Sequence, residues 1–301
     1  MKAGFIGLGN MGGPMVEWLL KAGVPTVVHD LREESAVTAL DLGATWAASA
    51  AEVAAQCDVI CTCLPGPPEM EAVYLGPGGV MEGIKDGGIC VDHTTNSPDS
   101  VRKVGGAISE RGGSLLDAPM DGGRESSLGG NMTLFVGGDE AVLDRARPVL
   151  DCYAANVVLV GELGTGSVTK IVHNALANSI DLLVAECMTL GVKAGVTMPN
   201  LVNAFNQGCI VSQNLTFTQR MPATLFKGDF TARFALKLAH KDYLLARGLA
   251  QSTGVPTRLV DLCQDEILEA MNRGWGESDR IRASTLQEER AGVQLRMDPA
   301  S

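Results

Sequence analysis

The N-terminal end of the chain combines a short apolar segment, a glycine-rich turn and the start of a helix. The segment Lys2 to Ile6 has the composition of a buried strand, and Gly7, Gly9 and Gly12 follow it with GxGxxG spacing. Helix-forming residues come next, with Pro14 in the first turn, where its missing N–H costs little. In such a unit the glycines allow a tight turn, a close approach of the backbone to a phosphate, and close packing of the helix on the strand. The sequence therefore predicts a site for a dinucleotide.

The turn and the following strand supply the other expected cofactor contacts. Asn10 and Met11 lie at the helix N-terminus, where free N–H groups and a positive partial charge favour phosphate. The second expected strand ends at Asp30, where an acidic side chain accepts hydrogen bonds from the adenine ribose. A carboxylate there would repel a 2′-phosphate, which predicts NAD in preference to NADP, although Arg32 could face such a phosphate. The alternative for Asp30 is a helix cap, because Glu33 follows three residues later.

Expected strands alternate with helical stretches through the N-terminal half. Further strands are expected at 26–30, 58–65, 87–92, 114–117, 131–136 and 156–160. This alternation predicts an α/β fold with a mostly parallel, doubly wound sheet, that is, a Rossmann-type domain. Ligands bind outside the carboxyl ends of strands in such sheets. Leu64, Pro65 and Thr95 fall at those ends, and we expect them beside the cofactor.

The pattern changes after a glycine-rich joint at 161–166. Helical stretches without convincing strands follow at 167–193, 198–207, 234–252 and 256–273. We therefore predict a dinucleotide-binding domain over 1–162 and an all-helical domain over 163–301, which begins with a long interdomain helix. The charged segment from Glu288 onward is expected to be mobile.

Composition excludes several classes of partner. The formal net charge is −11 without a long basic run, which argues against nucleic acid and anionic membranes as partners. The eight cysteines include no CxxC pair, and we interpret them as buried thiols in a reducing compartment. We find no signal peptide, no apolar run of membrane-spanning length and no histidine spacing typical of a metal site. A soluble cytoplasmic protein is expected.

Three later segments resemble, together with the N-terminal GFIGLGNMGGPM, the motifs of the β-hydroxyacid dehydrogenase family. They are DAPMDGG at 117–123, GELGTGSVTKIVHN at 161–174 and FALKLAHKD at 234–242. That family includes 3-hydroxyisobutyrate dehydrogenases and tartronate semialdehyde reductases. The resemblance covers nearly the whole chain in the right order. It implies NAD-dependent, reversible oxidation of a hydroxyl group on a small acid-bearing substrate, in a homodimer or homotetramer.

The resemblance places the catalytic lysine at Lys170. Hydride transfer between an alcohol carbon and a nicotinamide needs a proton partner for the oxygen, which a partly desolvated lysine can provide. Lys170 and Asn174 are four residues apart and so share a helix face, where the asparagine would hold the substrate oxygen or orient the lysine. The alternative for Lys170 is an exposed helix lysine. His173 stands where the family has another asparagine, and we favour a packing or supporting role over that of a base.

The resemblance assigns substrate binding to 117–123, and we expect Asp121, Gly122, Gly123 and Arg124 to line that site. Asp121 replaces the usual serine, and a carboxylate there would repel a substrate acid and favour a hydroxyl or an ammonium group. Arg124 replaces a small apolar residue and could supply an anion fork. The alternatives are a helix cap for Asp121 and a solvent-facing Arg124.

The resemblance also places the Dx[ST]T segment at 92–95 beside the cofactor. It puts Lys241 near the nicotinamide, for which the alternative is a solvated helix charge.

Two other functions remain possible on the same fold. One is an imine reductase, and the other is a non-catalytic NAD-binding regulatory or nucleosome-associated protein. The resemblance implies that imine reductases generally lack the lysine and that the regulatory proteins have lost it. Lys170 therefore argues against both.

Overall fold

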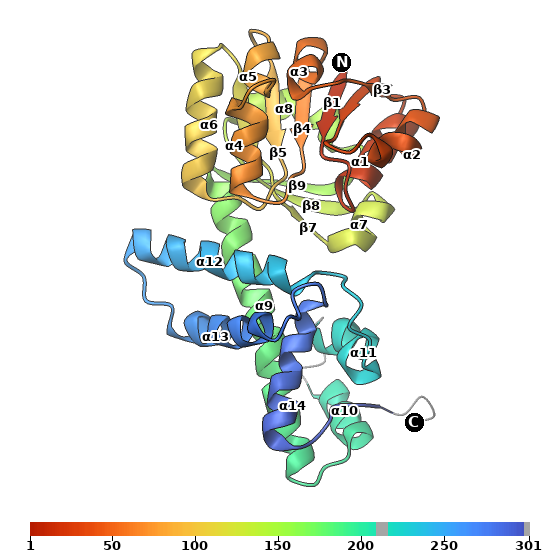
Figure 1. Cartoon of the computed structure of the whole chain (residues 1–301), viewed down its shortest axis with the longest axis vertical. Helices are drawn as coiled ribbons and strands as arrows, with labels where there is room; N and C mark the ends of the chain where they lie inside the picture. The colour runs from red at the N-terminus through yellow and green to blue at the C-terminus, as the bar shows by residue number, and fades with distance from the viewer. Residues whose placement is uncertain (209–215, 298–301) are drawn as a thin grey trace. The chain divides into compact units, whose positions relative to one another are not determined.

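The computed structural model describes residues 1–208 and 216–297 of the chain. It divides into two compact units, Met1–Ile171 and Val172–Ser301, which are described separately. The division falls inside the long helix α9 (Thr165–Lys193), which is labelled in Figure 1. The domain boundary predicted at residue 162 lies shortly before the start of this helix.

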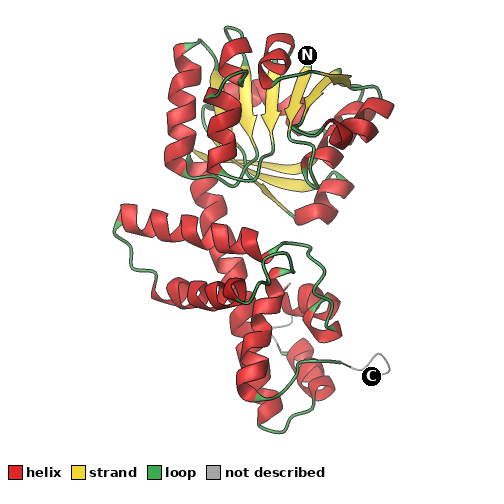
Figure 2. Cartoon of the chain, in the orientation of Figure 1, coloured by secondary structure: helices red, strands yellow, loops and turns green. Residues whose placement is uncertain are grey.

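The first unit is built on one nine-stranded sheet, drawn in yellow in Figure 2. Its strands are β1 (Ala3–Ile6), β2 (Thr26–His29), β3 (Thr45–Trp46), β4 (Val59–Thr62), β5 (Ile89–Asp92), β6 (Ser114–Asp117), β7 (Met120–Asp121), β8 (Met132–Gly137) and β9 (Ala154–Gly161). The order is β3-β2-β1-β4-β5-β6-β8-β7, and β9 pairs with β8. All pairs from β3 to β6 are parallel, whereas β8 is antiparallel to β6 and β7. The predicted mostly parallel, doubly wound sheet is confirmed.

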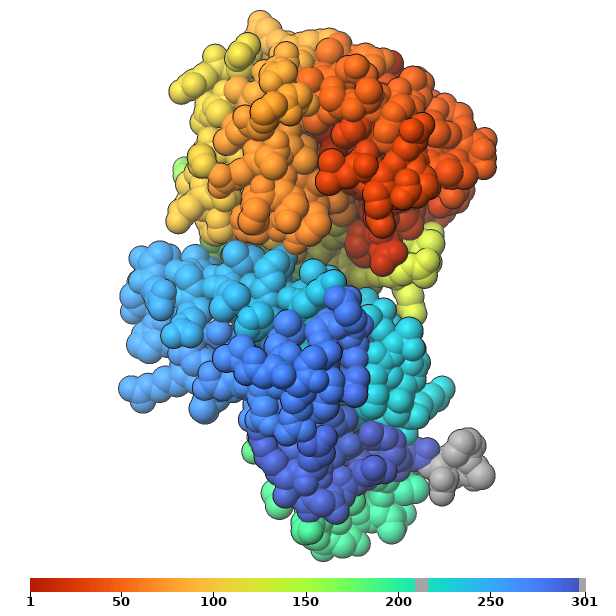
Figure 3. Space-filling view, in the orientation of Figure 1, coloured from red at the N-terminus to blue at the C-terminus, as the bar shows by residue number. Residues whose placement is uncertain are grey.

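Helices cover both faces of this sheet, and its central strands are therefore buried on both sides. Every residue of β1, β4 and β5 is buried, as is typical of parallel strands between two helical layers. The helices of this unit are α1 (Gly12–Lys21), α2 (Val37–Asp41), α3 (Ala50–Gln56), α4 (Pro67–Leu75), α5 (Val80–Gly83), α6 (Pro98–Glu110), α7 (Gly123–Gly129) and α8 (Glu140–Leu150). One apolar core joins α1, α2 and α8 to the sheet, and a second joins α3 to α6 to it. In Figure 3, the orange to yellow residues of α4, α5 and α6 cover one face of the first unit.

The second unit is helical in the residues that the structure describes. Besides the rest of α9, it contains α10 (Met198–Gln207), α11 (Met221–Ala223), α12 (Leu236–Thr253), α13 (Arg258–Asn272) and α14 (Thr285–Ala291). Two apolar clusters hold these helices together, one around Phe217 and Met221 and the other around Tyr243 and Leu286. The expected Rossmann-type domain followed by a helical domain is therefore confirmed.

The expectation of a mobile tail from Glu288 was wrong for the residues up to Met297. Glu288 is buried, and its Oε1 accepts hydrogen bonds from Leu295 N at 2.8 Å and from the Arg296 guanidinium at 2.7 Å. Leu295 is fully buried in an apolar cluster. Glu288, which the sequence suggested would be solvated, thus holds the C-terminal segment at Leu295 and Arg296 through hydrogen bonds. The last four residues lie outside the described part.

The expectation that no apolar run reaches membrane-spanning length was also wrong. Helix α9 is long and apolar enough to pass such a test by length and composition. Its Ala185 and Met188 are nevertheless fully buried in an apolar cluster of the second unit, and its Asp181 forms ion pairs with Arg220 and Arg280. These contacts join one part of the helix to the second unit, whereas Leu176, Leu183 and Leu190 of the same helix are exposed.

The cysteines in the described part of the chain are free thiols. Cys57, Cys61 and Cys90 are buried as expected, and burial raises the pKa of the Cys57 thiol to about 11. Cys187 is exposed and Cys63, Cys152 and Cys263 are partly exposed, which corrects the expectation for these four residues. Cys209 lies outside the described residues.

Candidate cofactor site and active site

The three glycines of the N-terminal turn lie in different environments. Gly7 has a φ of +95°, and a Cβ there would lie 2.3 Å from the carbonyl oxygen of Cys63. A Cβ on Gly12 would lie 2.0 Å from the carbonyl oxygen of Gly7, so a side chain there would separate the helix from the strand. A Cβ on Gly9 would meet no atom within 4 Å. Gly7 and Gly12 therefore shape the turn, and Gly9 leaves its outer face open to a ligand.

The N-terminus of α1 fits an anionic group. Met11 occupies the N-cap position and makes no side-chain cap hydrogen bond. The first N–H groups of a helix have no partner within the helix, and the helix dipole places positive potential there. With the open face of Gly9, this is a cradle that fits the pyrophosphate of a dinucleotide.

Asp30 links the glycine-rich turn to the end of β2. Its Oδ2 accepts a hydrogen bond from Leu8 N at 2.8 Å, and its Oδ1 accepts one from Arg32 N at 2.9 Å. The 3₁₀ turn that follows (Glu33–Ala36) has Arg32 as its N-cap residue and no side-chain cap. The alternative of a helix cap for Asp30 is therefore not what the structure shows.

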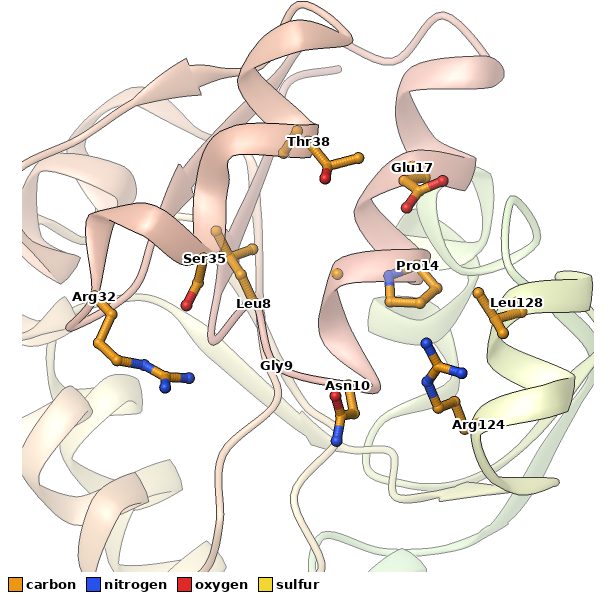
Figure 4. Close-up of a pocket in the computed structure, with 12 residues that line it drawn as sticks. Leu8, Gly9, Asn10, Pro14, Glu17, Arg32, Ser35, Thr38, Arg124 and Leu128 are labelled. Atoms are coloured by element: carbon orange, nitrogen blue, oxygen red, sulfur yellow. The ribbon is translucent and has the colours of Figure 1, made fainter. Parts of the chain in front are cut away.

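A pocket of about 340 Å³ opens beside this turn. Gly9 and Asn10 line it from the turn, Arg32 lines it from the segment after β2, and Arg124 lines it from α7 (Figure 4). Arg124 was expected at the substrate site or facing solvent, and the structure places it, exposed to solvent, beside the glycine-rich turn.

The loops after β4 and β5 meet at the carboxyl edge of the sheet. Thr62 and Asp92 are register partners at the ends of these strands. The Thr94 hydroxyl accepts a hydrogen bond from Leu64 N at 3.1 Å, which ties the two loops together. Leu64, Pro65 and Thr95 thus come together at this edge, next to β1 and its glycine-rich turn, because β4 pairs with β1.

Buried Asp92, the last residue of β5, forms hydrogen bonds with residues at this edge. The Thr62 hydroxyl donates to its Oδ1 at 2.7 Å, and Asn96 Nδ2 donates to its Oδ2 at 3.3 Å. Burial raises the pKa of the Asp92 carboxyl, and these hydrogen bonds oppose the rise.

Lys170 is buried, which excludes the alternative of an exposed helix lysine. Its residue is 8% exposed, and its Nζ lies 3.3 Å from Asp121 Oδ1. The side chain of Asp121 is 38% exposed, so this carboxylate faces both the lysine and solvent. The N-cap residue of α7 is Gly122, and no side chain caps that helix. Asp121 is therefore an ion-pair partner of Lys170 and not a helix cap.

Asp117 holds the N-terminus of α9 and thereby positions Lys170. Its Oδ1 accepts from Gly164 N at 2.8 Å, and its Oδ2 accepts from Ser167 N at 2.7 Å. Burial raises the pKa of the Asp117 carboxyl to about 6, against the effect of these hydrogen bonds. A Cβ on Gly166 would lie 2.4 Å from the carbonyl oxygen of Phe135, so α9 starts in close contact with the sheet. Sequence reasoning missed Asp117 as a positioning residue.

Asn174 is held by a buried carboxylate of the second unit. Its Nδ2 donates to Asp242 Oδ2 at 2.8 Å, and both residues are buried. This bond fixes which end of the amide is the oxygen, and His173 Nδ1 lies 3.4 Å from that oxygen. The Nζ of Lys241 lies 3.3 Å from Asp242 Oδ1. Asp242 belongs to the quoted segment 234–242, yet sequence reasoning gave it no role.

Two family models match the two parts of the chain. Residues 2–161 match the NAD-binding domain of 6-phosphogluconate dehydrogenase, and residues 164–285 match the NAD-binding domain of NADP-dependent 3-hydroxyisobutyrate dehydrogenase. The chain belongs to the β-hydroxyacid dehydrogenase family. The two matches together extend over both units of the chain. The cradle beside the glycine-rich turn lies in its NAD(P)-binding domain.

Its relatives include dehydrogenases with different named substrates. A 2-(hydroxymethyl)glutarate dehydrogenase of Eubacterium barkeri is 34% identical over 98% of this chain and 97% of its own length. An NAD-dependent L-serine dehydrogenase of Pseudomonas aeruginosa is 32% identical over 91% of this chain and 94% of its own. The structure of a Mycobacterium tuberculosis 3-hydroxyisobutyrate dehydrogenase with L-serine matches with a TM-score of 0.86 and 27% identity, covering 95% and 98% of the two chains.

Proposed function

We propose that this protein is an NAD-dependent dehydrogenase that reversibly oxidises the hydroxyl group of a small, acid-bearing substrate, with Lys170 as general acid and base. The observation that carries the proposal is the buried amine of Lys170, placed on α9 by Asp117 and paired with Asp121. A buried lysine beside one carboxylate suits proton transfer to and from an oxygen atom. We also propose that the enzyme acts in the cytoplasm, without a nucleic-acid or membrane partner.

Proton transfer at Lys170 complements the chemistry of the cofactor. A bound nicotinamide supplies or accepts the hydride. During oxidation Lys170 Nζ takes the proton of the substrate hydroxyl, and during reduction it returns a proton to the carbonyl oxygen. The oppositely charged carboxylate of Asp121 lies 3.3 Å from Lys170 Nζ and holds the amine in this position.

Asn174 and Lys241 have supporting roles in this proposal. With Nδ2 bound to Asp242, Asn174 presents its amide oxygen as an acceptor for the substrate hydroxyl. The ammonium group of Lys241, held by the same carboxylate, would lie on the cofactor side, as the family resemblance implies.

The substrate is proposed to carry a hydrogen-bond donor next to the reacting hydroxyl. Asp121 is half exposed beside Lys170, so a hydroxyl or ammonium group of the substrate can reach it, and a carboxylate placed there would be repelled. L-Serine, named for two of the relatives, carries an ammonium group next to its hydroxymethyl group. A panel of plain 3-hydroxy acids, hydroxy amino acids, amino alcohols and polyols, followed by NADH absorbance, tests the proposal. If none of these compounds reduces NAD, the proposed function is overturned.

We predict that NAD binds more tightly than NADP. The Asp30 carboxylate at the end of β2 accepts hydrogen bonds from ribose hydroxyls and repels a 2′-phosphate. Fluorescence titrations with NADH and NADPH measure the two dissociation constants. In the Asp30→Asn variant the preference for NADH is expected to shrink. An NADPH affinity equal to or tighter than that for NADH in the wild type would contradict the assignment.

A homodimer or homotetramer is predicted through the helical unit. In α9, Val172, Leu176, Leu183 and Leu190 are 57–70% exposed. Leu176, Leu183 and Leu190 repeat every seven residues, which places them on one helix face that another chain can cover. Light scattering at micromolar concentration should give a multiple of 31.5 kDa, and Leu183→Lys should lower it. A mass of one chain for the wild type would refute this prediction.

A further inference from the structure

Helix α7 is fastened to the glycine-rich turn and to α1. The Ser127 hydroxyl donates a hydrogen bond to the carbonyl oxygen of Met11 at 2.8 Å, and Trp18 Nε1 donates to the carbonyl oxygen of Leu128 at 3.2 Å. A Cβ on Gly130 would lie 2.6 Å from the Trp18 ring, so the end of α7 touches α1 closely. These contacts bring a helix from the segment expected to bind substrate to the cofactor cradle.

Arg124 stands in the first turn of α7 and faces this cradle. It lines the pocket together with Asn10 and Pro14, which lie at the N-terminus of α1. Figure 4 shows its guanidinium beside Asn10 and below Pro14, whereas Arg32 approaches from the far side of the turn. Among residues 1–208 and 216–297, no carboxylate pairs with Arg124. Its five N–H donors are therefore available to a ligand.

The charges around the pocket favour an anion at this position. Glu17, the acidic residue that lines the pocket, is paired with Lys21 at 3.5 Å. The uncapped N-terminus of α1 adds positive potential. An arginine next to uncapped amides is a suitable partner for a phosphate, because guanidinium and phosphate oxygens form paired, charge-assisted hydrogen bonds.

We propose that Arg124 binds the pyrophosphate of the dinucleotide and not the acid group of the substrate. The inference concerns the NAD(P)-binding domain, and it does not depend on the reaction proposed for Lys170. Arg124 acts from α7, on the opposite side of the glycine-rich turn from Arg32, so the pyrophosphate lies between the α1 N-terminus and this guanidinium. The hydrogen bonds of Ser127 and Trp18 hold α7, which carries Arg124, against the glycine-rich turn and α1.

Binding of cofactor fragments tests this role without any turnover. Isothermal titration calorimetry of the wild type and of Arg124→Gln would use ADP-ribose, adenosine and 2′-AMP. We expect the dissociation constant of ADP-ribose to rise about five-fold or more, because a charge-assisted hydrogen bond is lost. The constants for adenosine and 2′-AMP should stay within about two-fold of wild type. Arg111→Gln, a change of an exposed arginine outside the pocket, should leave all three unchanged.

Three other outcomes overturn the proposal for Arg124, each in a distinct way. An unchanged ADP-ribose constant in a folded variant, checked by its melting temperature, removes Arg124 from the cofactor site. A weaker constant for 2′-AMP alone would make it a 2′-phosphate residue. A raised substrate KM at saturating NAD with unchanged ADP-ribose binding would return it to the substrate site. Inactivity of the wild type on every substrate would overturn the proposed reaction and leave these binding results intact.

Discussion

Lys170→Ala is expected to lower kcat by roughly 10²- to 10⁴-fold, the usual contribution of a positioned general acid or base. The lysine is buried and its Nζ lies 3.3 Å from Asp121, so no other side chain of the variant supplies an amine in the same geometry. The change removes the proton partner from both directions of the reaction. Steady-state kinetics with the best substrate of the panel measure the loss, and NADH titration checks cofactor affinity, which should change little.

A matched variant separates this effect from a general disturbance of α9. Lys193→Ala removes an exposed lysine from the last turn of the same helix and should keep wild-type turnover. Added methylamine is expected to restore part of the activity of Lys170→Ala, because it supplies the missing amine in the cavity that the side chain leaves. An alanine variant that keeps most of its turnover would show that Lys170 does not carry the proton.

The parts of the fold that sequence reasoning anticipated are those determined by local patterns. The glycine-rich turn depends on Gly7, Gly9 and Gly12 within a few residues, and the strand before it is apolar along its whole length. Long amphipathic or apolar stretches gave α10 with its bounds unchanged and α9 within two residues of its start. Strands β3 and β7 escaped prediction because a strand of two residues is too short to show an alternating pattern.

Contacts between distant parts of the chain could not be predicted from local sequence patterns. Asp117 binds the start of α9 across 47 to 50 residues of sequence, and Asp242 binds Asn174 across 68 residues. No spacing rule connects such pairs, because their proximity follows from how strands and helices pack. The same limit applies to Arg124, whose position next to Gly123 suggested the substrate site. The turn of α7 directs its side chain to the cofactor pocket instead.

Asp121→Ser is expected to change substrate choice by at least about tenfold. The measured quantity is kcat/KM for a plain 3-hydroxy acid divided by kcat/KM for an amino- or polyhydroxylated substrate. The half-exposed carboxylate beside Lys170 repels an acid group and accepts hydrogen bonds from ammonium or hydroxyl groups. Serine removes the repulsion, so the ratio should rise by roughly tenfold, which corresponds to about 1.4 kcal/mol.

Two further variants distinguish the charge of Asp121 from its shape. Asp121→Asn keeps the size of the side chain without the charge, and we expect it to raise the ratio as well. Asp144→Ser, which alters an exposed aspartate on α8, should leave it unchanged. An unchanged substrate ratio in both Asp121 variants would mean that Asp121 does not select the substrate.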